Sequence, residues 1–188
     1  MKYNTITFGS VERYQSETCY KSFSQKTTCK IVVAPNEKLD KYLQNEDKYL
    51  LNRNKFFPIL PALKLAKYID KNDIDIVHFH WTKDILTAVL AKIISKKKPT
   101  LIQSRHMGMT RFKDDIYHRW LYKHIDMMHA VTYKVKEQLE KFIPQDVRPK
   151  IEMVYLGTES SDIDESVVAE LKAKYKPNGE FLVGIVGR

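Results

Sequence analysis

Histidine, arginine and hydroxyl side chains follow the ends of several apolar, strand-like runs in this chain. The sharpest of these clusters is Ser104-Arg105-His106. A histidine can act as an acid, a base or a hydrogen-bond donor near neutral pH, and an adjacent arginine can pair with a phosphate or a carboxylate. The alternative is a surface histidine beside a solvated arginine. No Ser-His-Asp or Cys-His order can be assigned to this segment.

A pair of histidines lies in the strand-like run before that cluster. His78 and His80 are two residues apart, so on a strand their side chains point to the same face. No third ligand of the right type is nearby, and we therefore expect no metal site. We expect His78 to be buried against a helix. His80 and Trp81 stand at the strand end, where an imidazole and an indole can contact a sugar ring, although Trp81 suits a core position equally well.

Small or hydroxyl residues follow two other strand-like runs. Gly9-Ser10 can bring backbone N–H groups close to an anion at a helix start. One glycine makes no dinucleotide-binding fingerprint, however, and a plain turn with Ser10 as the N-cap is the favoured interpretation. Thr132 and Lys134 follow a later run in the same way. These four residues complete the set of candidate substrate-binding residues.

The candidates share one location because strand-like and helical patterns alternate along the chain. The expected strands cover residues 5–8, 29–34, 75–80, 100–104, 127–132 and 151–155, and the expected helices cover 11–25, 36–50, the segment from Pro58 to about 71, 83–95, 114–124, 134–142 and 162–176. Crossover connections predict parallel pairing in a doubly wound, Rossmann-like α/β sheet. Ligands of such sheets bind at the carboxyl ends of the strands, which is where the candidates lie.

Two of the expected helices carry an apolar stripe that should face the core. The first stripe consists of Leu60, Leu63, Leu65, Ala66 and Ile69, and the second consists of Ile116, Trp120, Leu121 and Ile125. Leu and Ile at such spacing normally pack on a sheet.

Composition limits the class of protein. The chain has 188 residues, 43% of them hydrophobic, and a net charge of +9. No run approaches the roughly 20 apolar residues that cross a bilayer, and Cys19 and Cys29 have no metal or redox spacing, so a cytoplasmic location is expected. The charge suits nucleic acid, an anionic membrane or phosphorylated small molecules, but a lysine-rich solvated surface explains it equally well. No nucleic-acid motif is present, and no nucleic-acid partner is expected.

The last eight residues form an apolar run, 181–188, that suits a strand buried on both faces. We interpret this run as the first strand of a further domain. The expected organisation is therefore one domain over residues 1–178, followed by the opening strand of a second over 179–188. The alternative is a complete, non-catalytic α/β ligand-binding domain.

The sequence resembles the GT-B glycosyltransferases of family 4 in an ordered set of blocks. These blocks are residues 64–80, 99–106, 128–139, 154–159 and 183–188. Two positions depart from the family pattern. Only Gly9 remains of the usual Gly-Gly pair in the first loop, and Leu156 stands where the family has an asparagine before glycine.

The resemblance implies the N-terminal, acceptor-binding half of a GT-B fold. Its implied activity is the retaining, hexosyltransferase-type transfer of a sugar from a nucleotide-sugar to a cell-envelope polysaccharide or lipid-linked acceptor. His106 matches the family's catalytically important histidine, and Gly9 would lie near the donor phosphates. No cofactor is implied beyond the nucleotide-sugar co-substrate. Because the family's donor-binding groups belong to the C-terminal domain, this chain alone is expected to be inactive.

A basic, aromatic segment of the chain, together with its net charge of +9, suits contact with a membrane. Residues 119–123, Arg-Trp-Leu-Tyr-Lys, suit peripheral contact with the inner face of an anionic membrane. A solvated helix whose Trp120 belongs to the core is the alternative.

Overall fold

The computed structural model describes residues 4–9, 28–35, 38–43, 48–52, 58–156, 163–175, 181 and 183. The chain divides into two compact units, Met1–Tyr155 and Leu156–Arg188, each treated by itself. The helix expected over 11–25, Ser10 and most of the expected terminal strand lie outside the described residues. The assignment of domains therefore stays a prediction.

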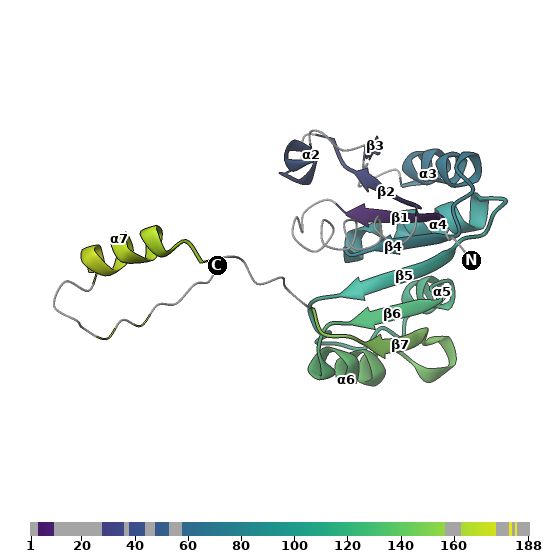
Figure 1. Cartoon of the computed structure of the whole chain (residues 1–188). Helices are drawn as coiled ribbons and strands as arrows, with labels where there is room; N and C mark the ends of the chain where they lie inside the picture. The colour runs from purple at the N-terminus through teal and green to yellow at the C-terminus, as the bar shows by residue number, and fades with distance from the viewer. Residues whose placement is uncertain are drawn as a thin grey trace. The chain divides into compact units, whose positions relative to one another are not determined.

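The first unit is built on a seven-stranded parallel sheet (Figure 1). Its strands are β1 Asn4–Gly9, β2 Thr28–Val33, β3 Lys48–Leu50, β4 Ile76–Phe79, β5 Thr100–Arg105, β6 Met127–Ala130 and β7 Lys150–Met153. The spatial order is β3-β2-β1-β4-β5-β6-β7, and every neighbouring pair is parallel. The predicted Rossmann-like α/β class is confirmed. The direction of winding reverses between β1 and β4.

Strand β3 was not expected from the sequence, which predicted one helix over residues 36–50. Within that segment the described helical residues are those of α2, Lys38–Tyr42. Pairing with β2 holds the backbone of Lys48–Leu50 in an extended conformation. The ring of Tyr49 stacks on that of Tyr68 at a centroid distance of 4.1 Å. The next residue, Leu51, is fully buried. Edge pairing and this burial outweigh the weak helical preference of a polar segment.

The remaining helices are α3 Ile59–Lys71, α4 Ile85–Ile94, α5 Ile116–Lys123, α6 Tyr133–Phe142 and, in the second unit, α7 Glu165–Tyr175, with short 3₁₀ turns η1 Thr82–Asp84 and η2 Gln145–Val147. The predicted helices near these ranges are confirmed, within a few residues at their ends. Among the described residues, no helix is long and apolar enough to cross a membrane.

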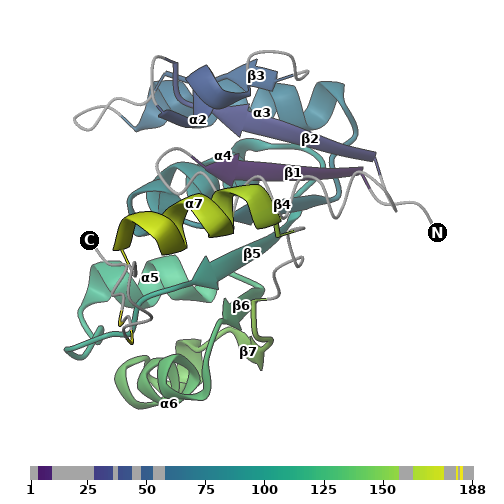
Figure 2. The ribbon, with the colours of Figure 1, turned by 60° about the vertical axis from the view of Figure 1, so that its left-hand side comes forward.

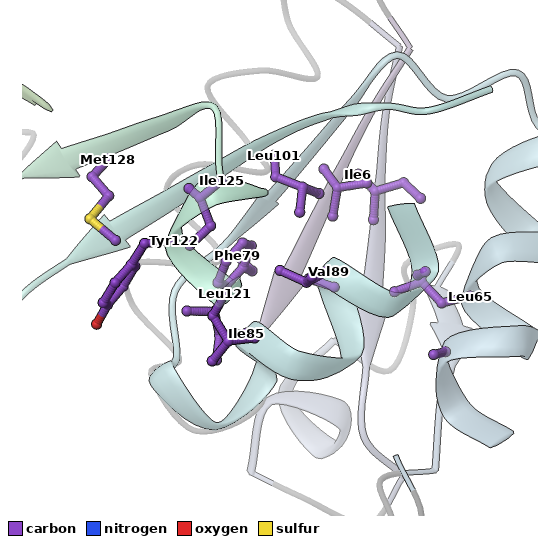
Figure 3. Close-up of a cluster of buried hydrophobic side chains, with 14 of the residues drawn as sticks. Ile6, Leu65, Phe79, Ile85, Val89, Leu101, Leu121, Tyr122, Ile125 and Met128 are labelled. Carbon is purple, nitrogen blue, oxygen red and sulfur yellow. The ribbon is translucent and has the colours of Figure 1, made fainter. Parts of the chain in front are cut away.

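The main core lies between one face of the sheet and helices α3 to α6 (Figure 2). The strand residues that face these helices alternate along the chain, as Val77 and Phe79 do in β4. Figure 3 shows Phe79, Leu101 and Met128 of the sheet packed toward Ile85, Val89 and Leu121 of the helices. The opposite face carries a smaller cluster, in which Ile31 and Val33 meet Leu39 and Leu43. Right-handed crossovers explain this division, because the connections run in opposite directions on the two sides of β1/β4.

The two predicted apolar stripes are partly wrong. In α3 the buried residues are Pro61, Ala62, Leu65, Ala66 and Ile69, whereas Leu60 and Leu63 are 62% and 37% exposed. Ala62, Leu65, Ala66 and Ile69 follow the i, i+3, i+4, i+7 spacing of one helix face, and Leu60 points away from it. In α5, Leu121 is buried and so is the following Ile125, but Ile116 and Trp120 are 89% and 36% exposed.

Substitution of leucine by alanine at two positions of α3 should separate the buried face from the exposed one. We expect Leu65→Ala to lower the free energy of unfolding by about 2–5 kcal/mol, because it opens a cavity in the core. Leu60→Ala should change it by less than about 0.5 kcal/mol. Urea titrations of both variants measure the difference. Equal losses would show that the α3 face is assigned wrongly.

Candidate functional site

Polar side chains gather where β4, β5 and β6 end, on the sheet face opposite helices α3 to α6. Val77 and Phe79 of β4 face the helices, so His78, and His80 just after the strand, face the other way. Ser104 is directly opposite His129 in the register of β5 and β6. Because the three strands are parallel neighbours, these side chains lie at one edge of the sheet.

Side-chain hydrogen bonds connect β4, β5 and β6. Nε2 of His78 lies 2.8 Å from the Ser104 hydroxyl, which lies 2.9 Å from Nδ1 of His129. Nε2 of His129 lies 2.8 Å from the carbonyl oxygen of Val154. A carbonyl only accepts, so His129 must donate from Nε2. When that is its only ring proton, Ser104 donates to His129 and accepts from His78.

A second contact joins His80, just after β4, to His106, just after β5. Nδ1 of His80 is 3.3 Å from Nε2 of His106. The His80 ring also lies near the His78 ring, at a centroid distance of 4.5 Å. The pairing brings together two residues that the sequence proposed as site residues, one of which is the catalytic candidate.

Burial keeps the imidazoles of His78, His80 and His106 neutral. It is the main cause that lowers the pKa of His78 to about 3 and that of His106 to about 4, with the neighbouring His129 lowering both further. The pKa of His80 is also lowered, first by burial and then by His78 and His106. A neutral imidazole has one donor and one acceptor nitrogen. Near pH 7 these residues can therefore exchange hydrogen bonds with hydroxyl groups but carry no charge of their own.

Arg105 supplies the charge at this edge, and it points to the opposite side of the sheet from Ser104. Its position in β5 has the same parity as that of Leu101, which faces the helices. The guanidinium donates to the Thr82 hydroxyl at 2.6 Å and to the Met107 carbonyl at 3.3 Å. These bonds tie the end of β5 to the turn that follows β4.

The other predicted binding residues lie apart from this cluster or have a structural partner. Trp81 is half-buried, with the Lys83 ammonium 4.5 Å from its ring centroid. Thr132 is the N-cap of α6, and its hydroxyl accepts from the Val135 N–H at 3.2 Å. Lys134 is exposed on α6. Gly9 ends β1 opposite Val33 of β2.

Sequence reasoning did not select two of the residues that complete the site. His129 lies inside the family block 128–139 and Thr82 follows Trp81, but neither was selected as a candidate site residue. A usable signal was present for His129, because it is the penultimate residue of a strand, as Ser104 is of β5. Among the described residues, no group of three His, Cys, Asp or Glu side chains is arranged to hold a metal ion.

Comparison with known proteins identifies the family. The profile of Glycosyltransferase Family 4 matches residues 27–161. No curated protein matches the chain significantly. The matched range contains the sheet from β2 to β7 and all four histidines of the cluster.

Solved structures with the same fold include several glycosyltransferases. A glycosyltransferase from Rickettsia africae aligns with a TM-score of 0.70 at 19% identity, over 93% of this chain and 49% of its own length. The lipopolysaccharide outer core galactosyltransferase WaaB aligns at 0.60 and 19% identity, over 85% and 47%. Anabaena HepE, solved with UDP, aligns at 0.59 and 12% identity, over 93% and 50%. The chain spans about half the length of these proteins and has the N-terminal half of a GT-B fold.

The lowered pKa of His78 predicts loss of stability in mild acid. Between about pH 6.5 and 3 the unfolded chain protonates this residue and the folded chain does not, so its contribution is fully present above pH 6.5 and is lost as the pH falls. From pH 7 to 5 this amounts to about 2 kcal/mol for one such histidine. Gln at position 78 keeps a side-chain amide near Ser104 without a titrating ring. Urea unfolding of wild type and His78→Gln at pH 7 and 5 should show a smaller loss in the variant. Parallel losses would contradict the assignment.

Proposed function

The chain belongs to glycosyltransferase family 4, and we propose that it is the acceptor-binding domain of a retaining, hexosyltransferase-type enzyme. The enzyme transfers a sugar from a nucleotide-sugar to a cell-envelope polysaccharide or a lipid-linked acceptor. The observation that carries this proposal is the His80–His106 pair at the carboxyl edge of a family 4 sheet. In the reaction, the bond from the anomeric carbon to the nucleoside diphosphate breaks and a bond to an acceptor oxygen forms. The acceptor proton leaves with the nucleoside diphosphate.

His106 is the catalytic residue of this proposal, and its role is that of a hydrogen-bonding group. A histidine with a pKa of about 4 is neither a ready acid nor a strong base at pH 7. The contact with His80 holds its ring in one orientation, which favours a fixed hydrogen bond to a sugar hydroxyl in the transition state. His80 is then a positioning residue, and Ser104 and His129 hold the strand ends in place.

Binding of the nucleotide-sugar donor requires groups other than the histidine cluster. A nucleotide-sugar presents a diphosphate, and the solved complex of Anabaena HepE with UDP supports a uridine nucleotide as the first donor to test. In the proposed enzyme a second domain holds most of the donor. The backbone near Gly9, at the end of β1, contacts the donor phosphates. The domain by itself is then inactive, and no cofactor other than the nucleotide-sugar is required.

Exposed apolar residues on α5 support peripheral contact with an anionic membrane on its cytoplasmic side. Ile116 and Trp120, predicted to be in the core, lie on the surface beside Lys123. Apolar side chains with flanking cations are typical of interfacial helices. A lipid-linked acceptor would then reach the domain from that surface.

Substitution of His106 by alanine in the full-length protein should lower kcat for sugar transfer by about 10²- to 10³-fold, since one transition-state hydrogen bond is lost. His124→Ala, which removes a histidine at the end of α5, should leave kcat near that of wild type. Transfer from a panel of UDP- and GDP-sugars, followed by release of the nucleoside diphosphate, provides the measurement. An unchanged kcat for His106→Ala would refute the catalytic assignment.

The membrane proposal predicts salt-sensitive binding to vesicles. Wild-type protein should sediment with phosphatidylglycerol vesicles at low salt and not with phosphatidylcholine vesicles. Ile116→Ser should weaken this binding severalfold, whereas Leu60→Ser, at an equally apolar exposed site of α3, should not. Absence of binding to anionic vesicles at low salt would rule the contact out.

A further inference from the structure

A pocket on the helix side of the sheet adjoins the end of β5. Its volume is about 340 Å³. It lies between the turn after β4, the loop after β5 and helix α5. The lining residues are Thr82, Ile85, Arg105, Gly108, Met109, Thr110, Arg111, Lys113, Tyr117, His118, Leu121 and Tyr122. Of the site residues described above, Arg105 and Thr82 line it.

The polar rim of this pocket is cationic. Three basic side chains, those of Arg105, Arg111 and Lys113, line it, and none of the lining residues is Asp or Glu. The two acidic residues that precede α5 face other partners: Asp114 forms an ion pair with Arg119 at 2.6 Å, and the Asp115 carboxylate accepts a hydrogen bond from the His118 ring at 2.5 Å. Within the described part of the chain, no carboxylate forms an ion pair with Arg111 or Lys113.

Two of the cationic groups are held in place by neighbours. Arg105 is fixed by the Thr82 hydroxyl and the Met107 carbonyl. Lys113 lies 3.3 Å from Nε2 of His118, whose Nδ1 faces the Asp115 carboxylate. Because a carboxylate only accepts, Nδ1 of His118 donates to Asp115, and because an ammonium only donates, Nε2 of His118 accepts from Lys113. Fixed cations bind an anion with a smaller entropic cost than mobile surface lysines.

The pocket floor is apolar and adds a neutral hydroxyl. Ile85, Leu121 and Tyr122 belong to the buried core, and Figure 3 shows the Tyr122 hydroxyl pointing away from that cluster. Burial raises the pKa of Tyr122 to about 12 against the opposing effect of nearby Arg105. The hydroxyl therefore keeps its proton and can donate a hydrogen bond. Low polarity beneath the rim strengthens the attraction between a cation and a bound anion.

We propose that this pocket binds the phosphate group of the acceptor, so that the enzyme acts on a phosphorylated substrate. Arg105 lines the pocket and directly precedes His106, and Thr82 follows His80 by two residues. A phosphate held by Arg105, Arg111 and Lys113 would thus anchor the acceptor at the end of β5, across the edge of the sheet from the paired histidines. That the bound phosphate belongs to an acceptor rests on the proposed function, whereas the binding of phosphate itself does not. The phosphate can belong to a lipid-linked headgroup or to a soluble phosphorylated sugar.

Direct binding to the full-length protein tests this inference without any sugar transfer. The probes are glucose 6-phosphate and farnesyl phosphate in calorimetric titrations, with glucose and farnesol as uncharged counterparts. The double variant Arg111→Gln/Lys113→Gln should weaken binding of a phosphorylated probe at least about tenfold, since two charge-assisted contacts are lost. The matched control, Lys64→Gln/Lys67→Gln, removes the same charge from exposed positions of α3 and should bind as wild type does. Unfolding midpoints of both variants confirm that the fold is kept.

Every result of these titrations either supports or overturns the proposed phosphate site. Selective loss in the pocket variant supports the phosphate site, and preference for farnesyl phosphate or for glucose 6-phosphate identifies a lipid or a soluble source. Equal affinities of wild type and the pocket variant, equal losses in both variants, or equal binding of the uncharged counterparts would overturn it. Phosphate binding without any sugar transfer would refute the proposed function alone. If the pocket variant transfers sugar at the wild-type rate and neither protein binds the phosphorylated probes, only this inference is refuted.

Discussion

The parallel register of β4, β5 and β6 is the constraint on which the site depends. Parallel strands end at the same edge, and alternation along each strand assigns its residues to opposite faces. Ser104 therefore stands opposite His129, within reach of His78. A shift of one residue in any of these strands would exchange the histidines with apolar core residues. The large core beneath the sheet resists that exchange, and so the packing of Val77 and Phe79 fixes the polar site above them.

The two faces of the sheet edge supply different chemistry. On one face, burial keeps the imidazoles of His78, His80 and His106 neutral, so that they form hydrogen bonds with one another and with Ser104. On the other face, Arg105 extends toward α5 into a pocket with fixed cations. Uncharged hydrogen-bonding groups suit sugar hydroxyls, and cations suit phosphates. The end of β5 joins both environments, because adjacent residues of a strand point to opposite sides.

The sequence predicted much of this architecture, and its errors have identifiable causes. Alternating strand and helix patterns located six strands and the parallel sheet. Strand β3 was missed because three residues at a sheet edge carry no periodic signal, and only pairing with β2 makes them a strand. Leu60 and Ile116 were assigned to the core because leucine and isoleucine usually belong there. The tilt and rotation with which a helix packs on the sheet decide which side of a broad apolar stripe is covered, and this depends on distant partners.

The sequence by itself determined the kind of fold, the family and the strand ends where chemistry would occur, since all of these follow from local patterns. His80, Ser104, Arg105 and His106 could be selected in this way. Only the tertiary structure decided which of them meet. It paired His80 with His106, joined His78 to His129 through Ser104, and assigned the hydroxyl of Thr132 to a helix cap. It also brought Arg111 and Lys113 to the same pocket as Arg105. These contacts join residues brought together by crossovers, and no local pattern encodes the distance between them.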